Sequence, residues 1–294
     1  MNSYVLTCCS TADFPREYFV DRHIPFACFS YELNGVSHSD DLYLSTTPQE
    51  FYGALKAGGR SVTSQISVGA YVTFWESFLR EGMDVLHVTL SSGVTGTYNS
   101  ACLAAEQLSH RYPDRTIRVL DSLCASSGFG LLVDYMADMR DAGASLEEVY
   151  AWGLEHRRNL QSWFFVTDLD CLKRGGRVSA TSALLANALK ICPVLTIDAE
   201  GRLVPIEKIR TKKKAVSALA EKMELLADGG SAYAGKCCIS HSNCYEDACA
   251  VRDLLERRMP QLSGSIQIHD IGTVIGSHTG PGTVALFFMG EPRA

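Results

Sequence analysis

The sequence lacks a long hydrophobic run, and its N-terminus lacks a charged segment followed by a short apolar stretch. A membrane-spanning helix needs about 18 consecutive apolar residues, so the sequence predicts no stable membrane anchor and no signal peptide. An excess of basic residues is also missing, since 27 Lys and Arg stand against 33 Asp and Glu, for a net charge of −6. This balance argues against a protein that coats nucleic acid through its overall charge, so we expect no nucleic-acid partner.

The 11 cysteines follow no metal-binding or disulfide pattern. Their number is odd, and Cys102, Cys171 and Cys192 lie inside apolar segments, which is typical of free thiols in a reducing compartment. The cysteine-rich stretch 237–249 has no C-x-x-C spacing, and its first members alternate along an expected strand, so they point to opposite faces. We therefore expect a cytoplasmic protein without a metal site. A cysteine-based redox sensor is an alternative that the scattered positions do not favour.

Length and composition are those of a compact globular protein. At about 150 residues per domain, the 294 residues favour two domains. Hydrophobic residues make up 46% and charged residues 20%, which excludes wholesale disorder and collagen-like or low-complexity architectures. The boundary is expected in the polar segment 155–162. We predict an N-terminal α/β domain over residues 1–157 and a C-terminal α/β domain over residues 158–294.

The N-terminal half alternates between helical and strand patterns. Residues 68–79 carry apolar side chains at helical spacing, Gly82 ends that helix, and the apolar run 84–90 predicts a buried strand. The expected elements that follow are a helix over 101–108, a strand over 116–121 and a helix over 131–139. Strands separated by helices are typical of βαβ units, so we expect a parallel sheet covered by helices.

The C-terminal half is expected to contain a mixed sheet with helices. Residues 192–198 and 203–210 flank a turn at Gly201, which favours an antiparallel pair. The other expected elements are strands over 162–168, 236–241, 266–278 and 284–289, and helices over 184–190, 216–226 and 245–258.

Two segments rich in Ser and Thr open helices. In SVTSQISVGAY (61–71), Thr63 and Ser64 precede an apolar helix and are suited to capping it. In LSSGVTGTYNSA (90–101), Ser92 and Thr95 lie in a glycine-containing loop between a buried strand and a helix. Such a loop presents backbone N–H groups to an anion. The spacing matches neither a dinucleotide fingerprint nor a P-loop, so anion binding and helix capping remain two interpretations.

Basic and glycine-rich segments supply further candidates. KRGGR (173–177) places three cations around two glycines, which suits a phosphate, a carboxylate or an acidic partner, or a solvated helix end. The basic run 210–215 is either a solvated face or a docking surface for an acidic partner. His278 lies in a glycine-rich run that is expected to fix its ring, with no acidic residue nearby in sequence.

Taken in order, these segments resemble the DegV family of bacterial fatty-acid-binding proteins, which serve as the lipid-carrying subunit of fatty acid kinase. The resemblance extends over essentially the whole chain. It rests on TSQIS (63–67), SSGVTGTYNSA (91–101), Asp121–Ser122, LKRGGRVS (172–179), PVL (193–195) with IRTKKKA (209–215), and IGTVIGSHTGPG (271–282). The resemblance implies two α/β domains with a long-chain fatty acid held between them. It also implies that hydroxyls near the interdomain cleft bind the carboxylate.

The resemblance also implies which residues bind the ligand and the partner. The carboxylate would contact Thr63, Ser92 and His278, with Ser64, Gly93, Thr95 and Thr279 beside them. The kinase subunit would contact Arg177, Arg210 and Lys212. The implied protein is a carrier and not an enzyme, with no cofactor besides its bound fatty acid. One departure is Cys9, which stands where the family usually has the Asp of an Asp-Ser-Thr sequence.

An enzyme is the alternative function. A hydrolase or acyl transferase acting on a lipid-like ester would use Ser92 or another loop hydroxyl as nucleophile and His278 as base. The missing G-x-S-x-G motif and the lack of an orienting acid near His278 in sequence count against this alternative.

Overall fold

The computed structural model describes residues 4–167, 169–178 and 191–294. Its N-terminal part contains a four-stranded parallel sheet with the order β2-β1-β6-β7. The strands are β1 (Tyr4–Cys9), β2 (Phe26–Ala27), β6 (Asp84–Thr89) and β7 (Ile117–Asp121). Five of the six residues in β1 and in β6 are buried, as expected of parallel strands with both faces covered. The predicted parallel sheet is confirmed.

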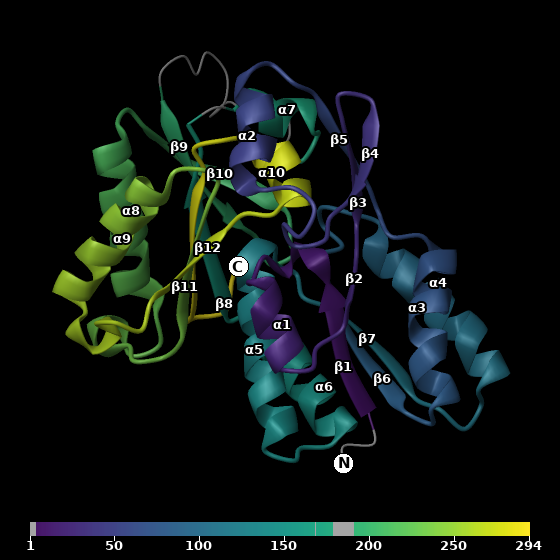
Figure 1. Ribbon diagram of the computed structural model, residues 1–294. Coiled ribbons are helices and arrows are strands. Elements are labelled where there is room, and N and C mark those ends of the chain that lie inside the picture. The colour runs from purple at the N-terminus through teal and green to yellow at the C-terminus, as the bar shows by residue number, and fades with distance from the viewer. Residues whose placement is uncertain (1–3, 168, 179–190) are drawn as a thin grey trace.

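Helices cover both faces of this parallel sheet. Figure 1 shows α3 and α4 on one side and α1, α5 and α6 on the other. Their bounds are α1 (Arg16–Asp21), α3 (Val68–Arg80), α4 (Thr97–Arg111), α5 (Ser126–Asp141) and α6 (Leu146–His156). Helix α3 turns Tyr71, Trp75 and Leu79 toward the core, because residues three or four apart share one face of a helix. The hydroxyl of Ser67 caps α3 by accepting a hydrogen bond from the N–H of Ala70.

The C-terminal part contains a six-stranded mixed sheet with the order β10-β9-β8-β13-β11-β12. The strands are β8 (Leu160–Phe165), β9 (Cys192–Ile197), β10 (Leu203–Ile209), β11 (Cys237–His241), β12 (Gln267–Asp270) and β13 (Val284–Met289). Strands β9 and β10 form the predicted antiparallel pair, and only β11 and β12 run parallel to each other. Helices α8 (Lys212–Leu226) and α9 (Tyr245–Arg258) cover one face of this sheet (Figure 1).

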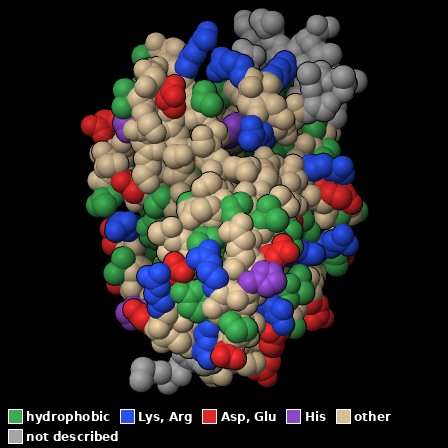
Figure 2. Space-filling model, turned by 90° about the vertical axis from the view of Figure 1, so that its right-hand side faces the viewer, with side chains coloured by type: hydrophobic (Ala, Val, Ile, Leu, Met, Phe, Trp, Pro, Cys, Tyr) green, Lys and Arg blue, Asp and Glu red, His purple; other side chains and the backbone are tan. Residues whose placement is uncertain are grey.

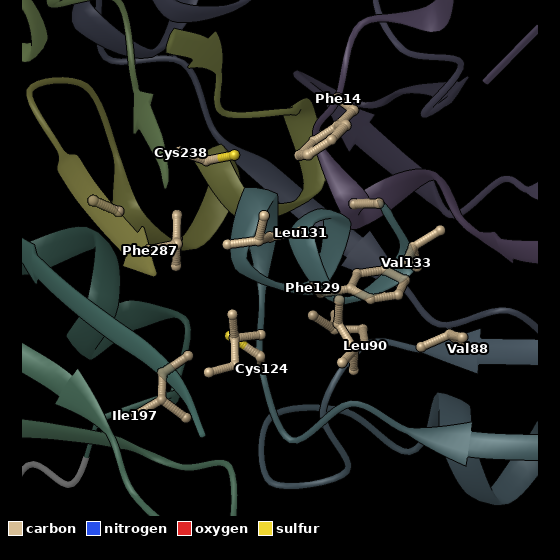
Figure 3. Close-up of a cluster of buried hydrophobic side chains, with 14 of the residues drawn as sticks. Phe14, Val88, Leu90, Cys124, Phe129, Leu131, Val133, Ile197, Cys238 and Phe287 are labelled. Carbon is tan, nitrogen blue, oxygen red and sulfur yellow. The ribbon is translucent and has the colours of Figure 1, made fainter. Parts of the chain in front are cut away.

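Helix α5 joins the two α/β parts, because it packs against strands of the mixed sheet as well as against the N-terminal part. Figure 3 shows Leu131 and Phe129 of α5 between Phe287 of the mixed sheet and Leu90, which directly follows the parallel strand β6. The chain thus has a two-domain α/β fold. Helix α6 ends at His156 and β8 begins at Leu160.

A third, three-stranded antiparallel sheet was not predicted. It has the order β4-β3-β5 and consists of β3 (Ser30–Leu33), β4 (Val36–Ser39) and β5 (Ser61–Ser64), with α2 (Pro48–Lys56) beside it. This sheet reaches the C-terminal helix α10 (Thr273–Thr279), and the hydroxyl of Tyr52 donates a hydrogen bond to the carbonyl of Ile271 at 2.7 Å. The N-terminal part thereby extends over the end of the C-terminal part.

Two elements expected in the C-terminal part lie at residues 266–278 and 184–190. The strand expected over 266–278 is wrong in its second half, because β12 ends at Asp270 and residues 273–279 form α10. Gly272 precedes α10 and Gly280 follows it with φ of +71°, a conformation that suits glycine at the end of a helix. The helix expected over 184–190 lies outside the described residues. The short helix α7 (Asp170–Arg174) packs against α10.

Candidate functional site

A cavity of about 450 Å³ is lined by residues of the mixed sheet, of β5 in the three-stranded sheet and of α10, and by residues that follow the strands β2 and β6 of the parallel sheet. Apolar side chains make up much of its wall, including Leu90 after β6, Phe164 on β8 and Phe287 on β13. Polar side chains of β5, α10 and the neighbouring loops form a second part of the lining. Clefts of this size with a few polar groups in a largely apolar wall bind small ligands.

The side chains of Thr63 and His278 meet in the polar part of the cavity. Thr63 Oγ1 lies 2.8 Å from His278 Nε2, although the two residues are 215 positions apart in sequence. Alternate residues of β5 face the same side, so Ser61 and Thr63 both turn toward α10, where Ser61 Oγ lies 2.7 Å from Ser277 Oγ. The third sheet therefore brings a threonine to the histidine.

The His278 ring is enclosed and uncharged. Burial and the positive charge of Arg177 lower the pKa of His278 to about 4, so the imidazole is neutral at neutral pH. Its Nδ1 is buried without a hydrogen-bond partner among the described residues. Gly175 lies directly against this atom, because a Cβ there would stand 2.4 Å from Nδ1. Unpaired buried donors are rarer than unpaired acceptors, which favours the tautomer with its hydrogen on Nε2.

Arg177 lies in the wall of the cavity. Its Nε donates a hydrogen bond to the carbonyl of Val94 at 3.1 Å, and Nη1 donates to the carbonyl of Gly175 at 2.6 Å. The residue was expected among the partner contacts, but here its side chain contacts the loop after β6. Burial lowers the pKa of Arg177, and a guanidinium nevertheless stays charged. The polar part of the cavity thus includes one cation.

The remaining carboxylate candidates divide into two groups. Ser64, Thr95 and Thr279 line the cavity. Ser92 and Gly93 do not: Ser92 is exposed, and its N–H donates to the carboxylate of Asp121 at 3.1 Å. Gly93 instead lets two loops touch, because a Cβ there would stand 2.5 Å from the backbone of Gly201.

The neighbouring Ser91, and not Ser92, is buried at this contact. The hydroxyl of Ser91 donates to the carbonyl of Gly201 at 2.8 Å, so this loop hydroxyl joins the two domains. The structure therefore places Ser91 in an interdomain contact and Ser92 at the surface. Neither side chain lines the cavity.

Arg210 and Lys212 lie at the surface, away from the cavity lining. Lys212 Nζ forms an ion pair with Asp247 of α9 at 2.6 Å. Thr211 between them caps α8 by accepting a hydrogen bond from the N–H of Lys214. Lys and Arg side chains also gather at the upper end of the face in Figure 2, whereas charges of both signs are interspersed over its lower part.

Four polar residues of the cavity wall, Gln65, Ser126, Ser162 and Thr283, were not among the site candidates taken from the sequence. Gln65 donates from Nε2 to the hydroxyl of Ser100 at 3.0 Å, and Ser126 and Ser162 lie among apolar residues. Gln65 directly follows Thr63 and Ser64, so its place in the TSQIS segment was a usable signal. Nothing in the strand SWFFVTD distinguishes Ser162 before the sheet is formed.

The position occupied by Cys9 is fully buried. Cys9 Sγ lies 3.3 Å from the hydroxyl of Tyr71 and 3.6 Å from His87 Nε2. Burial raises the pKa of the Cys9 thiol to about 12 and lowers the pKa of His87 to about 3, so neither group is suited to nucleophilic or redox chemistry. Among residues 4–167, 169–178 and 191–294, no three His, Cys, Asp or Glu side chains are placed to hold a metal ion together.

The geometry does not favour the hydrolase alternative. The expected nucleophile Ser92 is outside the cavity lining, and His278 Nε2 contacts Thr63 instead. Within the described part of the chain, no carboxylate is bonded to His278 Nδ1 to orient the ring as a catalytic base. In that part, no helix is both long enough and apolar enough to cross a membrane.

Comparisons with known proteins agree with this description. The family model described as "Uncharacterised protein, DegV family" matches residues 7–291. A DegV domain-containing protein of Clostridium perfringens is 35% identical over 293 residues, which covers 100% of this chain and 99% of the relative. A relative from Streptococcus pyogenes is 34% identical over 288 residues, covering 96% of each chain.

Solved structures extend the comparison. A DegV family protein from Thermus thermophilus, described by its fatty acid binding, has a TM-score of 0.85 at 28% identity and covers 99% of this chain and 100% of its own. A hypothetical protein from Thermotoga maritima, described as revealing a fatty acid binding function, has a TM-score of 0.80 at 29% identity with the same coverage. The match to the family model, the two-domain fold and these similarities together show that the chain described here belongs to the DegV family.

Proposed function

We propose that this protein binds a long-chain fatty acid in the cavity and presents its carboxylate to a separate kinase subunit, which forms the acyl phosphate. The observation that carries the proposal is the composition of the cavity wall. Apolar side chains line most of it, and Thr63, His278 and Arg177 come together in its polar part. The fatty-acid-binding function of the related structures supports the same ligand.

The polar part of the cavity suits a carboxylate. With the hydrogen of the neutral His278 ring on Nε2, this N–H donates to Thr63 Oγ1, and the Thr63 hydroxyl hydrogen is free to bond the ligand. The guanidinium of Arg177 offsets the negative charge. We propose Thr63, His278 and Arg177 as the carboxylate site, with Ser64, Thr95 and Thr279 beside it.

The acyl chain supplies most of the affinity. Burial of about 15 methylenes at roughly 0.8 kcal/mol each contributes about 12 kcal/mol, whereas one hydrogen bond to a charged group contributes about 1.5–3 kcal/mol. Association costs of about 4–15 kcal/mol are deducted from this sum. The polar contacts therefore serve mainly to hold the carboxylate where a partner reaches it. Such a carrier needs no nucleophile or base of its own.

Arg210 and Lys212 are the proposed partner contacts. Both are exposed, and a charge at the rim of an interface acts mainly on association rate and salt dependence. Arg177 lines the cavity and its charge acts on His278, so we move it from the partner surface to the ligand site.

Native mass spectrometry of the purified protein tests the ligand class. We expect a co-purifying acid with a long alkyl chain, which denaturation releases and added fatty acid replaces. Addition of a fatty acid kinase subunit and ATP is then expected to yield acyl phosphate, trapped with hydroxylamine. A protein that neither contains nor takes up fatty acid contradicts the proposal, as does hydrolysis of an ester by the isolated chain.

A further inference from the structure

The start of α10 is capped by a side chain of the N-terminal part. Gly272, the N-cap residue of α10, makes no side-chain cap hydrogen bond. The hydroxyl of Thr273, the first residue of α10, donates a hydrogen bond to Asp40 Oδ1 at 2.7 Å. The backbone N–H of Thr273 bonds the same carboxyl. Asp40 therefore caps a helix that begins 233 positions later in the sequence.

The carboxyl of Asp40 is itself fixed within the N-terminal part. Ser10 directly follows β1, and its hydroxyl donates to Asp40 Oδ2 at 2.6 Å. The same hydroxyl accepts a hydrogen bond from the N–H of Phe29 at 3.2 Å. Burial raises the pKa of Asp40, and the hydroxyls of Ser10 and Thr273 lower it. Each oxygen of the carboxyl thus has a donor, so the group cannot rotate without breaking a hydrogen bond.

The two residues that lead into α10 also contact the N-terminal part. The carbonyl of Ile271 accepts hydrogen bonds from the hydroxyls of Tyr43 and Tyr52. Gly272 lies directly against Asp13, because a Cβ at Gly272 would stand 2.5 Å from Asp13 Oδ1. The entry into α10 is therefore bonded or packed at consecutive residues by the other domain.

The far end of α10 carries His278. Five residues separate Thr273 from His278, which corresponds to a rise of about 7.5 Å along the helix. Asp40 directly follows β4, and Thr63 lies on β5, two strand spacings or roughly 10 Å away across the three-stranded sheet. Helix α10 packs on β3 and β5 of this sheet (Figure 1). One sheet therefore bonds α10 at its start through Asp40 and at its end through Thr63.

We propose that Asp40 is a positioning residue of the carboxylate site, because it fixes the start of α10 and thereby places His278 Nε2 against Thr63 Oγ1. Asp40 is outside the cavity lining, so it acts on a ligand only through the helix. The Nδ1 atom of His278 has no hydrogen-bond partner in the described part of the chain, so the place of the ring depends on the helix and on Thr63. The effect on the carboxylate rests on the proposed fatty-acid function, whereas the placement of the ring requires no ligand.

Asp40→Asn tests the inference with little change in side-chain volume. The amide has one acceptor oxygen, and its NH2 group is a donor where the carboxylate accepts a hydrogen bond, so it cannot serve the donors of both Ser10 and Thr273. A small misplacement of reacting groups lowers a rate strongly, so acyl phosphate formation at saturating fatty acid is expected to fall at least about tenfold. Fatty-acid affinity is expected to change less than about threefold, since the acyl chain supplies most of it.

The His278 ring supplies a readout without ligand or kinase. In protein stripped of lipid, the Nε2–H that donates to Thr63 is expected to give a slowly exchanging NMR resonance, assigned by its loss in His278→Gln. In Asp40→Asn, this resonance is expected to move toward its position in Thr63→Val, which lacks the acceptor. A general loss of stability without movement of α10 would not change it in this direction.

Tyr135→Phe is the matched control. The hydroxyl of Tyr135 on α5 accepts a hydrogen bond from the N–H of Lys236 at 3.1 Å, so it joins the same two parts of the protein away from the cavity lining. The variant is expected to keep the His278 resonance and the phosphorylation rate. If Asp40→Asn fails to fold, Thr273→Val removes the same hydrogen bond from the side of α10 and is expected to shift the resonance, whereas Thr273→Ser is expected to restore it.

The outcomes separate this inference from the proposed function. A folded Asp40→Asn or Thr273→Val with the wild-type resonance and the wild-type phosphorylation rate overturns the inference and leaves the fatty-acid function standing. An equal effect of Tyr135→Phe also overturns it, because the change then belongs to the domain contact in general. A shifted resonance in a protein that takes up no fatty acid supports the placement of His278 by Asp40 and overturns the proposed function instead.

Discussion

Replacing Thr63 by Val removes one hydroxyl and nearly preserves the volume of the side chain. Thr63 Oγ1 is 2.8 Å from His278 Nε2 and is the proposed donor to the ligand carboxylate. One hydrogen bond to a charged group is worth about 1.5–3 kcal/mol, against about 12 kcal/mol from the buried acyl chain. We therefore expect Thr63→Val to weaken fatty-acid binding by about 1–3 kcal/mol, a factor of about 5 to 150, without abolishing it.

The phosphorylation step is expected to suffer more than binding does. A carboxylate that has lost one of its fixed contacts samples other positions, and a small misplacement of reacting atoms lowers a rate strongly. The two quantities are measured by titration with a fluorescent fatty acid and by acyl phosphate formation at saturating acid. Ser61→Ala is the control, because Ser61 lies on the same face of β5, bonds Ser277 and is outside the cavity lining.

Two results would refute this reasoning. The first is an unchanged affinity and an unchanged phosphorylation rate in Thr63→Val, which would mean that the hydroxyl does not contact the carboxylate. The second is a loss of binding and of phosphorylation by the same factor, because a positioning role requires the phosphorylation rate at saturating acid to fall further. An effect of Ser61→Ala equal to that of Thr63→Val would assign the change to the strand and not to the hydroxyl.

Three further predictions concern the surface, the buried histidine and the domain contact. Arg210→Glu is expected to leave fatty-acid affinity unchanged and to raise the concentration of loaded protein that half-saturates the kinase, as followed by steady-state kinetics; loss of lipid binding with normal kinase kinetics would contradict it. The pKa of His278 falls from 6.5 to about 4 on folding, so the unfolded chain binds more protons between these values and stability decreases as pH falls through this window. Urea unfolding measures the free energy of unfolding of the wild type and of His278→Gln. The difference, wild type minus variant, is expected to fall from pH 6.5 to pH 4 and to be constant above pH 7. A difference that does not change with pH would refute the lowered pKa of His278. Gly93→Ala is expected to cost about 1–3 kcal/mol of stability, because its Cβ would stand 2.5 Å from the backbone of Gly201, whereas Gly69→Ala on open helix surface is expected to cost nothing; equal melting temperatures would contradict this.

Local patterns in the sequence were sufficient to predict several of the helices and strands in both α/β parts. The 3.6-residue spacing of Tyr71, Trp75 and Leu79 predicted α3, and the apolar run 84–90 predicted the buried strand β6. The turn at Gly201 predicted the antiparallel pair β9 and β10. These features depend on which face of one element is buried, and that information lies in consecutive residues.

Family motifs went further than local patterns, because they named Thr63 and His278 as candidates for one site. Nothing in the spacing of two residues 215 positions apart indicates that they touch. Their contact requires the unpredicted third sheet to carry β5 across to α10, and the short strands of that sheet have too little periodicity to stand out. The carboxylate-binding roles of these residues remain predictions.

Three placements could be known only from the tertiary structure. Arg177 contacts the loop after β6 and lines the cavity, although the sequence pattern of a cation beside two glycines is typical of a surface residue. Ser92 lies at the surface, whereas its neighbour Ser91 is buried between the domains. The two serines are adjacent in the loop, and the sequence does not distinguish their burial. Ser162 comes to line the cavity only when β8, β13 and α5 pack together. The physical reason is that the burial, the hydrogen-bond partners and the charge environment of a side chain depend on its neighbours in the folded protein. Those neighbours come from distant parts of the chain.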